Sequence, residues 1–242
     1  SVRDQVLLWG HPQQWMASAD LLYSLRTGQP SLERRRDGGR LGHADRFPDM
    51  GEMFRSAFTS LAAHTDITSA YDFSRCIWLC DVGGGSGELL ASILQAHPGA
   101  RGTLVEKPEA IARAESILAA AAVGSRCKLV AGDYFTDVPA GADAYILSDV
   151  LTELEDRDAI RLLRRCRFAM GPPGRLLILE RVIPADNAPG LGQLADLMCM
   201  VVTGGRVRSV DEFDQLFAPA GLVRTRTFET PSGYTLQEVR PA

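Results

Sequence analysis

The residues best suited to chemistry lie in Asp81-Val-Gly-Gly-Gly-Ser-Gly87, which follows an apolar run and precedes a sequence with helical periodicity. A strand, a glycine turn and a helix in this order direct backbone N–H groups toward a ligand, and glycine lets that ligand lie against the backbone. The dinucleotide pattern G-x-G-x-x-G fails, because Glu88 and Leu90 stand where its last glycine is required. The spacing instead fits G-x-G-x-G, formed by Gly83, Gly85 and Gly87.

Acidic residues lie at or just after the ends of three successive predicted strands. Asp81 ends the first, where a buried carboxylate is costly unless it meets a cation, such as the ammonium group of a ligand. Glu106 ends the second, where an acid can accept hydrogen bonds from a ribose diol. Asp133 ends the third and can accept from an exocyclic amine, while Tyr134 can stack on a base. Amine, ribose and adenine together predict S-adenosylmethionine, although each acid alone is equally consistent with a helix N-cap or a loop carboxylate.

The elements that must position these residues follow from hydrophobic periodicity. From residue 76 onward, short apolar runs alternate with helical stretches, which is typical of βαβ units and a parallel sheet. Two final strands joined by Pro-Ser-Gly predict a hairpin. The expected strands cover 77–81, 102–106, 127–133, 143–149, 174–184, 222–230 and 234–240, and the expected helices cover 12–28, 48–64, 87–97, 107–122, 155–170, 191–205 and 209–221.

The composition is that of a globular domain, with 45% apolar residues, 23% charged residues and a net charge of −4. It gives no reason to expect a nucleic acid or a membrane as partner. No apolar run reaches the roughly 18 residues of a spanning helix, and the first ten residues do not resemble a signal peptide, so we expect a cytoplasmic protein. Five cysteines without zinc-ligand spacing predict buried free thiols and no metal site.

Eight segments in family order resemble the S-adenosylmethionine-dependent O-methyltransferases of the plant caffeate and bacterial anthracycline-type polyketide group. They include DVGGGSGELL, LVEKPEAI, GDYFTDVPAGADAYILSDVL and GRLLILERVIP, and the set spans nearly the whole chain. The resemblance implies an α/β fold with N-terminal helices and a Rossmann-like, doubly wound sheet of seven strands that ends in an antiparallel hairpin. It also implies a helical lead-in and connector over 1–70 and an S-adenosylmethionine-binding methyltransferase domain over 71–242.

The same resemblance implies an aromatic, polyketide-like substrate and a role in natural product or antibiotic biosynthesis. Family members usually begin with a further helical segment that makes an intertwined dimer. We expect that this segment was removed or is supplied by a separate polypeptide. The implied cofactor contacts are Asp81, Gly83, Glu106, Asp133, Tyr134 and Ser148, with Phe54 and Phe58 covering the cofactor.

Two departures from the family bear on the reaction. Plant members carry a catalytic histidine where this chain has Thr152, and an acid where it has Val207, whereas Glu180 remains from that acid pair. The methyl group is already activated by the cofactor, so alignment of the acceptor matters most. An acidic phenol also needs little help from a base. We therefore predict methylation of a phenolic hydroxyl, largely by proximity and orientation, with Thr152 and Glu180 as candidate catalytic residues.

Several alternatives remain open at this point. Thr152 is equally consistent with a helix cap, and the position of Glu180 favours a structural acid at a strand end over a catalytic one. The cofactor could serve a non-methylating reaction, such as hydroxylation, decarboxylation or cyclisation. The chain could also be a cofactor-binding subunit of a larger complex. A dinucleotide oxidoreductase is disfavoured by Glu88 and Leu90.

Overall fold

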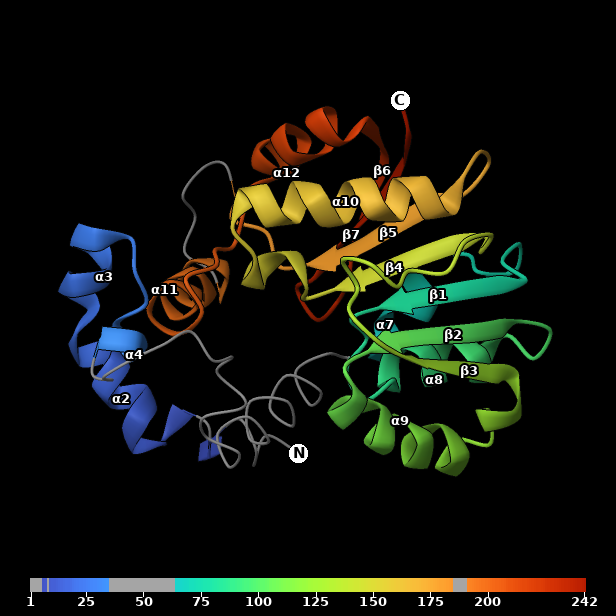
Figure 1. The fold of residues 1–242 in the computed structure, drawn as a ribbon, viewed down its shortest axis with the longest axis horizontal. Coiled ribbons are helices and arrows are strands. Elements are labelled where there is room, and N and C mark those ends of the chain that lie inside the picture. Colours follow the sequence, from blue (N-terminus) through green and yellow to red (C-terminus); the bar gives the residue numbers. More distant parts are fainter. Residues whose placement is uncertain (1–5, 8, 35–63, 185–190) are drawn as a thin grey trace.

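A sheet of seven strands forms the centre of the computed structural model, which describes residues 6, 7, 9–34, 64–184 and 191–242 (Figure 1). The strand order is β3-β2-β1-β4-β5-β7-β6, and β7 runs antiparallel to both of its neighbours. This arrangement confirms the predicted α/β fold with its C-terminal hairpin. The strands are β1 (Trp78–Val82), β2 (Arg101–Glu106), β3 (Cys127–Ala131), β4 (Ala144–Ser148), β5 (Arg175–Glu180), β6 (Leu222–Glu229) and β7 (Thr235–Pro241).

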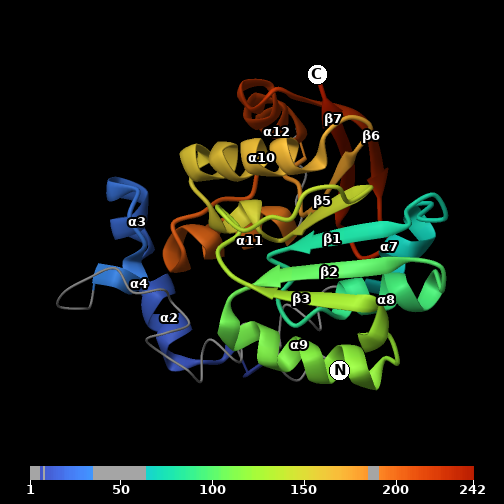
Figure 2. The ribbon, with the colours of Figure 1, turned by 45° about the vertical axis from the view of Figure 1, so that its right-hand side comes forward.

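Helices cover both faces of the sheet, and side-chain alternation along the strands builds one apolar core on each face (Figures 1 and 2). Leu79 and Ile146 belong to one core, whereas Cys80 and Leu147 belong to the other. The first core lies against α7 (His64–Ala70), α8 (Glu88–Ala96) and α9 (Pro108–Ala120), and the second against α10 (Asp156–Met170) and α12 (Val210–Phe217). Cover on both faces explains why the central strands read as continuous apolar runs.

The N-terminal helices lie beside the sheet and pack on α11 (Leu191–Val202) (Figure 1). The single helix predicted over 12–28 is wrong, because the chain breaks at Asp20 into two helices. Aspartate is a poor residue for a helix interior, a signal that periodicity alone overlooks, although the Asp20 side chain makes no capping hydrogen bond to α3. Gly28 ends the second helix with a φ of 68°, as predicted. The helices are α2 (Pro12–Ala19), α3 (Leu21–Thr27) and α4 (Ser31–Arg34).

Other expected elements agree with the structure to within a few residues at each end. The strand predicted over 174–184 stops at Glu180, and Val182 forms only an isolated bridge to Arg208. The helix predicted over 48–64 lies outside the described residues except for His64, where α7 begins. All five cysteines are free, and three of them are buried. None of the helices among the described residues has the length and apolar character needed to cross a bilayer.

Candidate active site

The carboxyl ends of the five parallel strands meet at one edge of the sheet, where β1 and β4 lie side by side but lead to helices on opposite faces. Open α/β sheets bind ligands at such a switch point. We call the residues after β1, β2 and β3 the loop half (81–88, 106 and 133–134). We call the residues after β4 and β5, with the segment that packs on them, the turn half (148–156, 180 and 205–208).

Backbone contacts hold the glycine loop between β1 and α8. Gly83 N donates to Val105 O at 2.9 Å, and Gly85 N donates to Glu106 Oε2 at 3.1 Å. Gly83, Gly85 and Gly87 have φ values of 73°, 58° and 81°, which glycine adopts without strain. A Cβ added at Gly85 would meet no heavy atom within 4 Å, so the loop presents open space there.

Asp81 lies beneath this loop rather than on its surface. Its side chain is fully buried, and neither carboxylate oxygen has a hydrogen-bond partner among the described residues. Burial, with smaller contributions from the charges of Glu106 and Glu88, raises the pKa of Asp81 to about 7. A Cβ at Gly84 would lie 2.2 Å from Asp81 Oδ2. Gly84, which the G-x-G-x-G pattern leaves out, is therefore the glycine that this packing requires.

Two further acids end the strands on the loop side. Glu106 accepts the backbone N–H of Gly85 through one oxygen and that of Lys107, at 2.8 Å, through the other. Each carboxylate oxygen has two acceptor positions, so Glu106 retains capacity for a ligand hydroxyl. Asp133 is exposed, and its Oδ1 accepts from Phe135 N at 2.8 Å. One of its oxygens therefore closes a turn, which matches the loop-carboxylate alternative.

Tyr134 lies where the loops after β1, β3 and β4 converge. A Cβ at Gly83 would lie 3.6 Å from the Tyr134 ring and 3.0 Å from Val150. Burial is the main cause of a raised pKa at Tyr134, so the phenol stays neutral. The centroid of the Tyr134 ring lies 4.8 Å from the centroid of the Phe135 ring.

The end of β4 is tied to the hairpin between β6 and β7. Ser148 ends the strand, and Asp149 follows with a positive φ of 53°. Asp149 Oδ2 accepts from Tyr234 Oη at 2.9 Å, and the Arg181 guanidinium lies 4.4 Å from the Tyr234 ring centroid. Burial raises the pKa of Asp149 to about 6, whereas the Tyr234 hydrogen bond and the Arg181 charge act in the opposite direction.

Thr152 and Glu180 are in direct contact. Thr152 lies in the 3-10 turn η2 (Leu151–Glu153), and its hydroxyl donates to Glu180 Oε2. Glu180 Oε1 accepts from Leu151 N at 2.8 Å and from Thr152 N at 3.4 Å. Burial, followed by the charge of Asp149, raises the pKa of Glu180 to about 8. Glu180 has no exposed surface, so only the half-buried Thr152 can meet a ligand.

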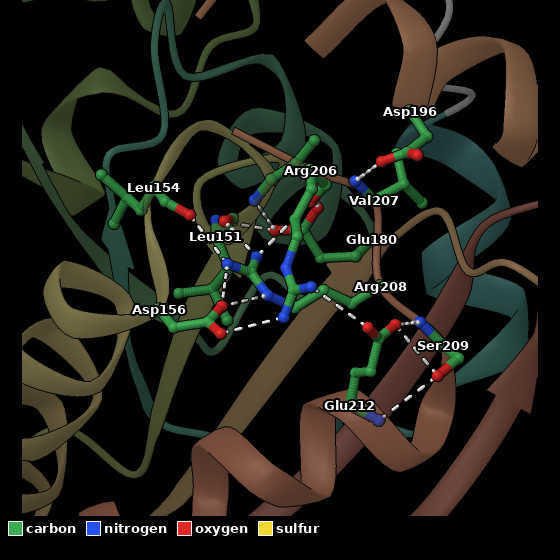
Figure 3. Close-up of polar contacts among 11 residues, drawn as sticks. Leu151, Leu154, Asp156, Glu180, Asp196, Arg206, Val207, Arg208, Ser209 and Glu212 are labelled. Atoms are coloured by element: carbon green, nitrogen blue, oxygen red, sulfur yellow. Dashed lines mark hydrogen bonds and ion pairs between the residues drawn. The ribbon is translucent and has the colours of Figure 1, made fainter. Parts of the chain in front are cut away.

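Arg208 holds the opposite side of the same turn (Figure 3). Its guanidinium is fully buried and donates to Leu151 O at 2.6 Å and to Leu154 O at 2.8 Å. It also bonds Asp156 Oδ1 at 2.8 Å and 3.1 Å. The N–H groups of Leu151 and Thr152 thus face the buried carboxylate of Glu180, and the carbonyl groups of Leu151 and Leu154 face a buried cation.

The segment that carries Arg208 is itself fixed in place. A Cβ at Gly205 would lie 2.0 Å from Thr152 O, so only glycine permits this close approach. Val207 N donates to Asp196 Oδ1 at 2.9 Å. Ser209 begins α12 with a capping box. Val207, which stands where plant relatives carry an acid, is buried.

Sequence reasoning identified the contact partners Thr152 and Glu180 separately, but it missed Gly84 and Arg208. The signal for Gly84 was present, since three consecutive glycines exceed what G-x-G-x-G needs. Arg208 gave no signal, because one arginine in an arginine-rich chain cannot be recognised as buried from its sequence neighbours. The predicted cofactor residues Phe54 and Phe58 lie outside the described residues.

The loop half fits the predicted cofactor. Two unpartnered oxygens of a buried acid, open space above Gly85 and spare acceptor capacity at Glu106 suit a ligand with a cationic group and hydroxyl groups. Residues 49–223 also match the O-methyltransferase domain family. The chain belongs to this family. Its members use S-adenosylmethionine, so that compound is the cofactor of this methyltransferase.

Related proteins agree with this assignment. Along its whole length, the methyltransferase is 39% identical to phenazine O-methyltransferase PhzM of Lysobacter antibioticus and covers 71% of that protein. Among solved structures, it superposes on the mitomycin 7-O-methyltransferase MmcR with a TM-score of 0.93 and 34% identity, covering 100% of this chain and 72% of that one. It also superposes on NcsB1, an O-methyltransferase from neocarzinostatin biosynthesis, with a TM-score of 0.87 and 29% identity, covering 99% and 74%. The chain is thus an S-adenosylmethionine-dependent O-methyltransferase of natural-product biosynthesis.

Proposed function

We propose that this methyltransferase methylates a phenolic hydroxyl of a small aromatic natural product. The Thr152 hydroxyl is the main support for this proposal, because it is the one group of the Thr152–Glu180 pair with access to a ligand. It lies at the switch-point edge of the sheet, beside the cofactor loop. NcsB1 was crystallised with S-adenosylmethionine and 2-hydroxy-5-methyl naphthoic acid, which supports an acceptor of this class.

The loop half has the groups needed to hold the cofactor, which supplies an electrophilic methyl group when bound. Glu106 accepts from the ribose hydroxyls, and Asp133 accepts from the exocyclic amine through the oxygen that Phe135 does not use. Tyr134 covers the base. Asp81 favours the cationic end of the cofactor through its charge beneath the glycine loop. Further contacts come from Gly83, Gly85, Gly87 and Ser148.

The turn half positions the acceptor. Thr152 has a hydroxyl whose proton is donated to Glu180, so its oxygen is free to accept from a phenol. Asp196 of α11 accepts from Val207 N at 2.9 Å, so α11 packs against the segment that supports the turn. Rate enhancement comes mainly from holding the acceptor oxygen in line, as expected for an enzyme without the histidine.

The proposal is tested by following the methyl group. The enzyme is incubated with S-adenosylmethionine labelled in its methyl group and with 2-hydroxy-5-methyl naphthoic acid. We expect labelled methyl ether, and we expect Glu106→Ala to abolish labelling at low cofactor concentration whereas Glu115→Gln, an exposed acid on α9, leaves it unchanged. Cofactor that binds in calorimetry while every phenol tested stays unlabelled would refute the proposal.

A non-methylating reaction is the second candidate. The chain is 36% identical over 237 residues to the aclacinomycin 10-hydroxylase RdmB of Streptomyces purpurascens. This identity, together with Thr152 in place of the histidine, supports hydroxylation as the second candidate reaction. The same assay separates the two, because consumption of an acceptor with no label in the product supports the second candidate.

A further inference from the structure

The buried carboxylate of Glu180 cannot contact a ligand directly, and its link to a ligand is the hydroxyl of Thr152. Glu180 has no exposed surface, and both of its oxygens are used by the turn at Leu151 and Thr152. Both backbone N–H groups bond Oε1, so the Thr152 hydroxyl is the partner of Oε2. This third bond connects a buried carboxylate to a half-buried side chain at the edge of the sheet.

The turn that carries this hydroxyl is held on both sides. Arg208 bonds the carbonyl groups of Leu151 and Leu154, and Gly205 allows the backbone to pack against the Thr152 carbonyl. The direction of the Thr152 hydroxyl is therefore set by groups that do not move with the ligand. Such rigidity is what a proton-transfer path requires, because transfer falls off steeply when hydrogen-bond geometry is lost.

We propose that Thr152 and Glu180 form a two-step proton relay that replaces the missing histidine as the base of the reaction. This inference rests on the proposed function. The O–H bond of the bound phenol breaks and its proton passes to Thr152 Oγ1, while the proton of Thr152 passes to Glu180 Oε2. The phenol oxygen keeps the electron pair and becomes the nucleophile. After the product leaves, Glu180 returns a proton to Thr152, and Thr152 releases its own to water.

In this relay, Thr152 is a catalytic residue because it touches the acceptor. Glu180 acts through Thr152 and is a positioning residue and proton store. Arg208 positions the turn from the other side and exchanges no proton with it.

The charged surroundings of Glu180 favour this role. Asp149, directly after β4, and Glu153 in the turn are acidic. Tyr234 beyond the hairpin turn donates to Asp149 at 2.9 Å, and the cation Arg181 lies 4.4 Å from the centroid of the Tyr234 ring. Burial and the charge of Asp149 raise the pKa of Glu180 to about 8. The pKa of such a carboxylate is much nearer to that of a phenol than the pKa of an ordinary carboxylate is, so proton transfer from the phenol costs less free energy. Since the relay needs ionised Glu180, kcat is expected to rise as pH increases through about 8.

The test compares Thr152→Val, Thr152→Ser and Glu180→Gln with the wild-type enzyme, using labelled cofactor and 2-hydroxy-5-methyl naphthoic acid across pH. We expect Thr152→Val and Glu180→Gln to lower kcat at high pH by about 10²-fold, the lower end of general-base contributions, with KM for S-adenosylmethionine unchanged. Glu180→Gln should also abolish the rise with pH, whereas Thr152→Ser, which keeps the hydroxyl, should restore most of kcat. Glu180→Gln keeps an oxygen that can accept from Leu151 N, which limits damage to the fold.

Failure of the relay and failure of the proposed function give different results. Wild-type enzyme that makes no labelled ether refutes the proposed function. A pH rise that persists in Glu180→Gln, or a Thr152→Val enzyme as active as wild type, refutes the relay alone. Absorbance titration of the bound naphthol with S-adenosylhomocysteine present tests the relay without turnover. Removing the nearby negative charge in Glu180→Gln should lower the pKa of the bound naphthol, and identical titrations would contradict the relay.

Discussion

The two halves of the active site place a buried acid in opposite situations. In the loop half, Asp81 is fully buried without a hydrogen-bond partner among the described residues. In the turn half, Glu180 is equally buried but accepts three hydrogen bonds from one turn. An unpaired buried carboxylate is costly, whereas a bonded one organises its surroundings. In the proposed function, the acid of the loop half meets the charge of a ligand, whereas the acid of the turn half holds the side chain of Thr152.

The supports of the two halves differ as well. Glycines shape the loop half, because a side chain at Gly84 would collide with Asp81 and Gly83 has a positive φ of 73°. A buried cation shapes the turn half, because Arg208 binds two carbonyl groups there. If this division is correct, substitutions in one half should affect the binding of one ligand and spare the other.

The largest effect is expected for Arg208→Gln. The change removes a buried cation, leaves the carbonyl group of Leu154 without its Arg208 donor and leaves that of Leu151 with only the Leu154 N–H, which should cost about 3 kcal/mol of unfolding free energy. Displacement of Thr152 should lower kcat by about 10²-fold, while calorimetric affinity for S-adenosylmethionine stays unchanged.

Arg206→Gln is the matched control for this prediction. Arg206 pairs with the same Asp156 carboxylate at 2.9 Å, but its side chain is 46% exposed. We expect Arg206→Gln to lower the unfolding free energy by at most about 1 kcal/mol. Equal losses in the two variants would show that the Asp156 ion pair, rather than the contacts of Arg208 with the turn, supports the active site.

Gly84→Ala should produce the converse result with a smaller loss of stability. Its Cβ would lie 2.2 Å from Asp81 Oδ2 and 2.6 Å from Leu104 Cδ1, so the loop must shift. We expect a cost of about 1–3 kcal/mol in thermal or urea unfolding, together with weaker binding of S-adenosylmethionine. Gly99→Ala is the control, because a Cβ there would meet no heavy atom within 4 Å. Normal cofactor affinity in Gly84→Ala would contradict the assignment of the loop half.

Tyr234→Phe is expected to have the smallest effect, and that effect depends on pH. The pKa of Asp149 lies near 6, above its ordinary value, so its contribution to stability is complete at low pH and is lost as pH rises through about 6. Removing the Tyr234 hydroxyl takes a hydrogen bond from the charged form and raises this pKa further.

Unfolding free energies of Tyr234→Phe and wild type should therefore differ by about 1 kcal/mol at pH 8 and by less at pH 5. Phenylalanine keeps the ring beneath Arg181, so the contrast isolates the hydroxyl. A difference that is the same at both pH values would mean that the hydroxyl does not stabilise the Asp149 anion.

Much of the fold and part of the site could be predicted from the order of residue types along the chain. Alternating apolar runs and helical stretches indicated the parallel sheet, because the periods of strands and helices are local properties of the chain. The glycine loop and Glu106 were identified by the same kind of local pattern. The break at Asp20 was missed because periodicity continues across it, although the residue type marked it.

The amino-acid sequence alone determined the order of the strands along the chain, the glycine loop, and the family and cofactor class, since each depends on residue type and spacing. Tertiary structure decided which residues act together. It brought Thr152 against Glu180 across 28 positions and placed Arg208 behind the same turn from a segment more than fifty residues away. These contacts arise because the crossover through α10 sets β5 beside β4. After α11, the chain then returns to the carboxyl ends of these two strands. Local periodicity does not predict these contacts, because a charged side chain can be buried only where residues distant in the sequence supply its partners.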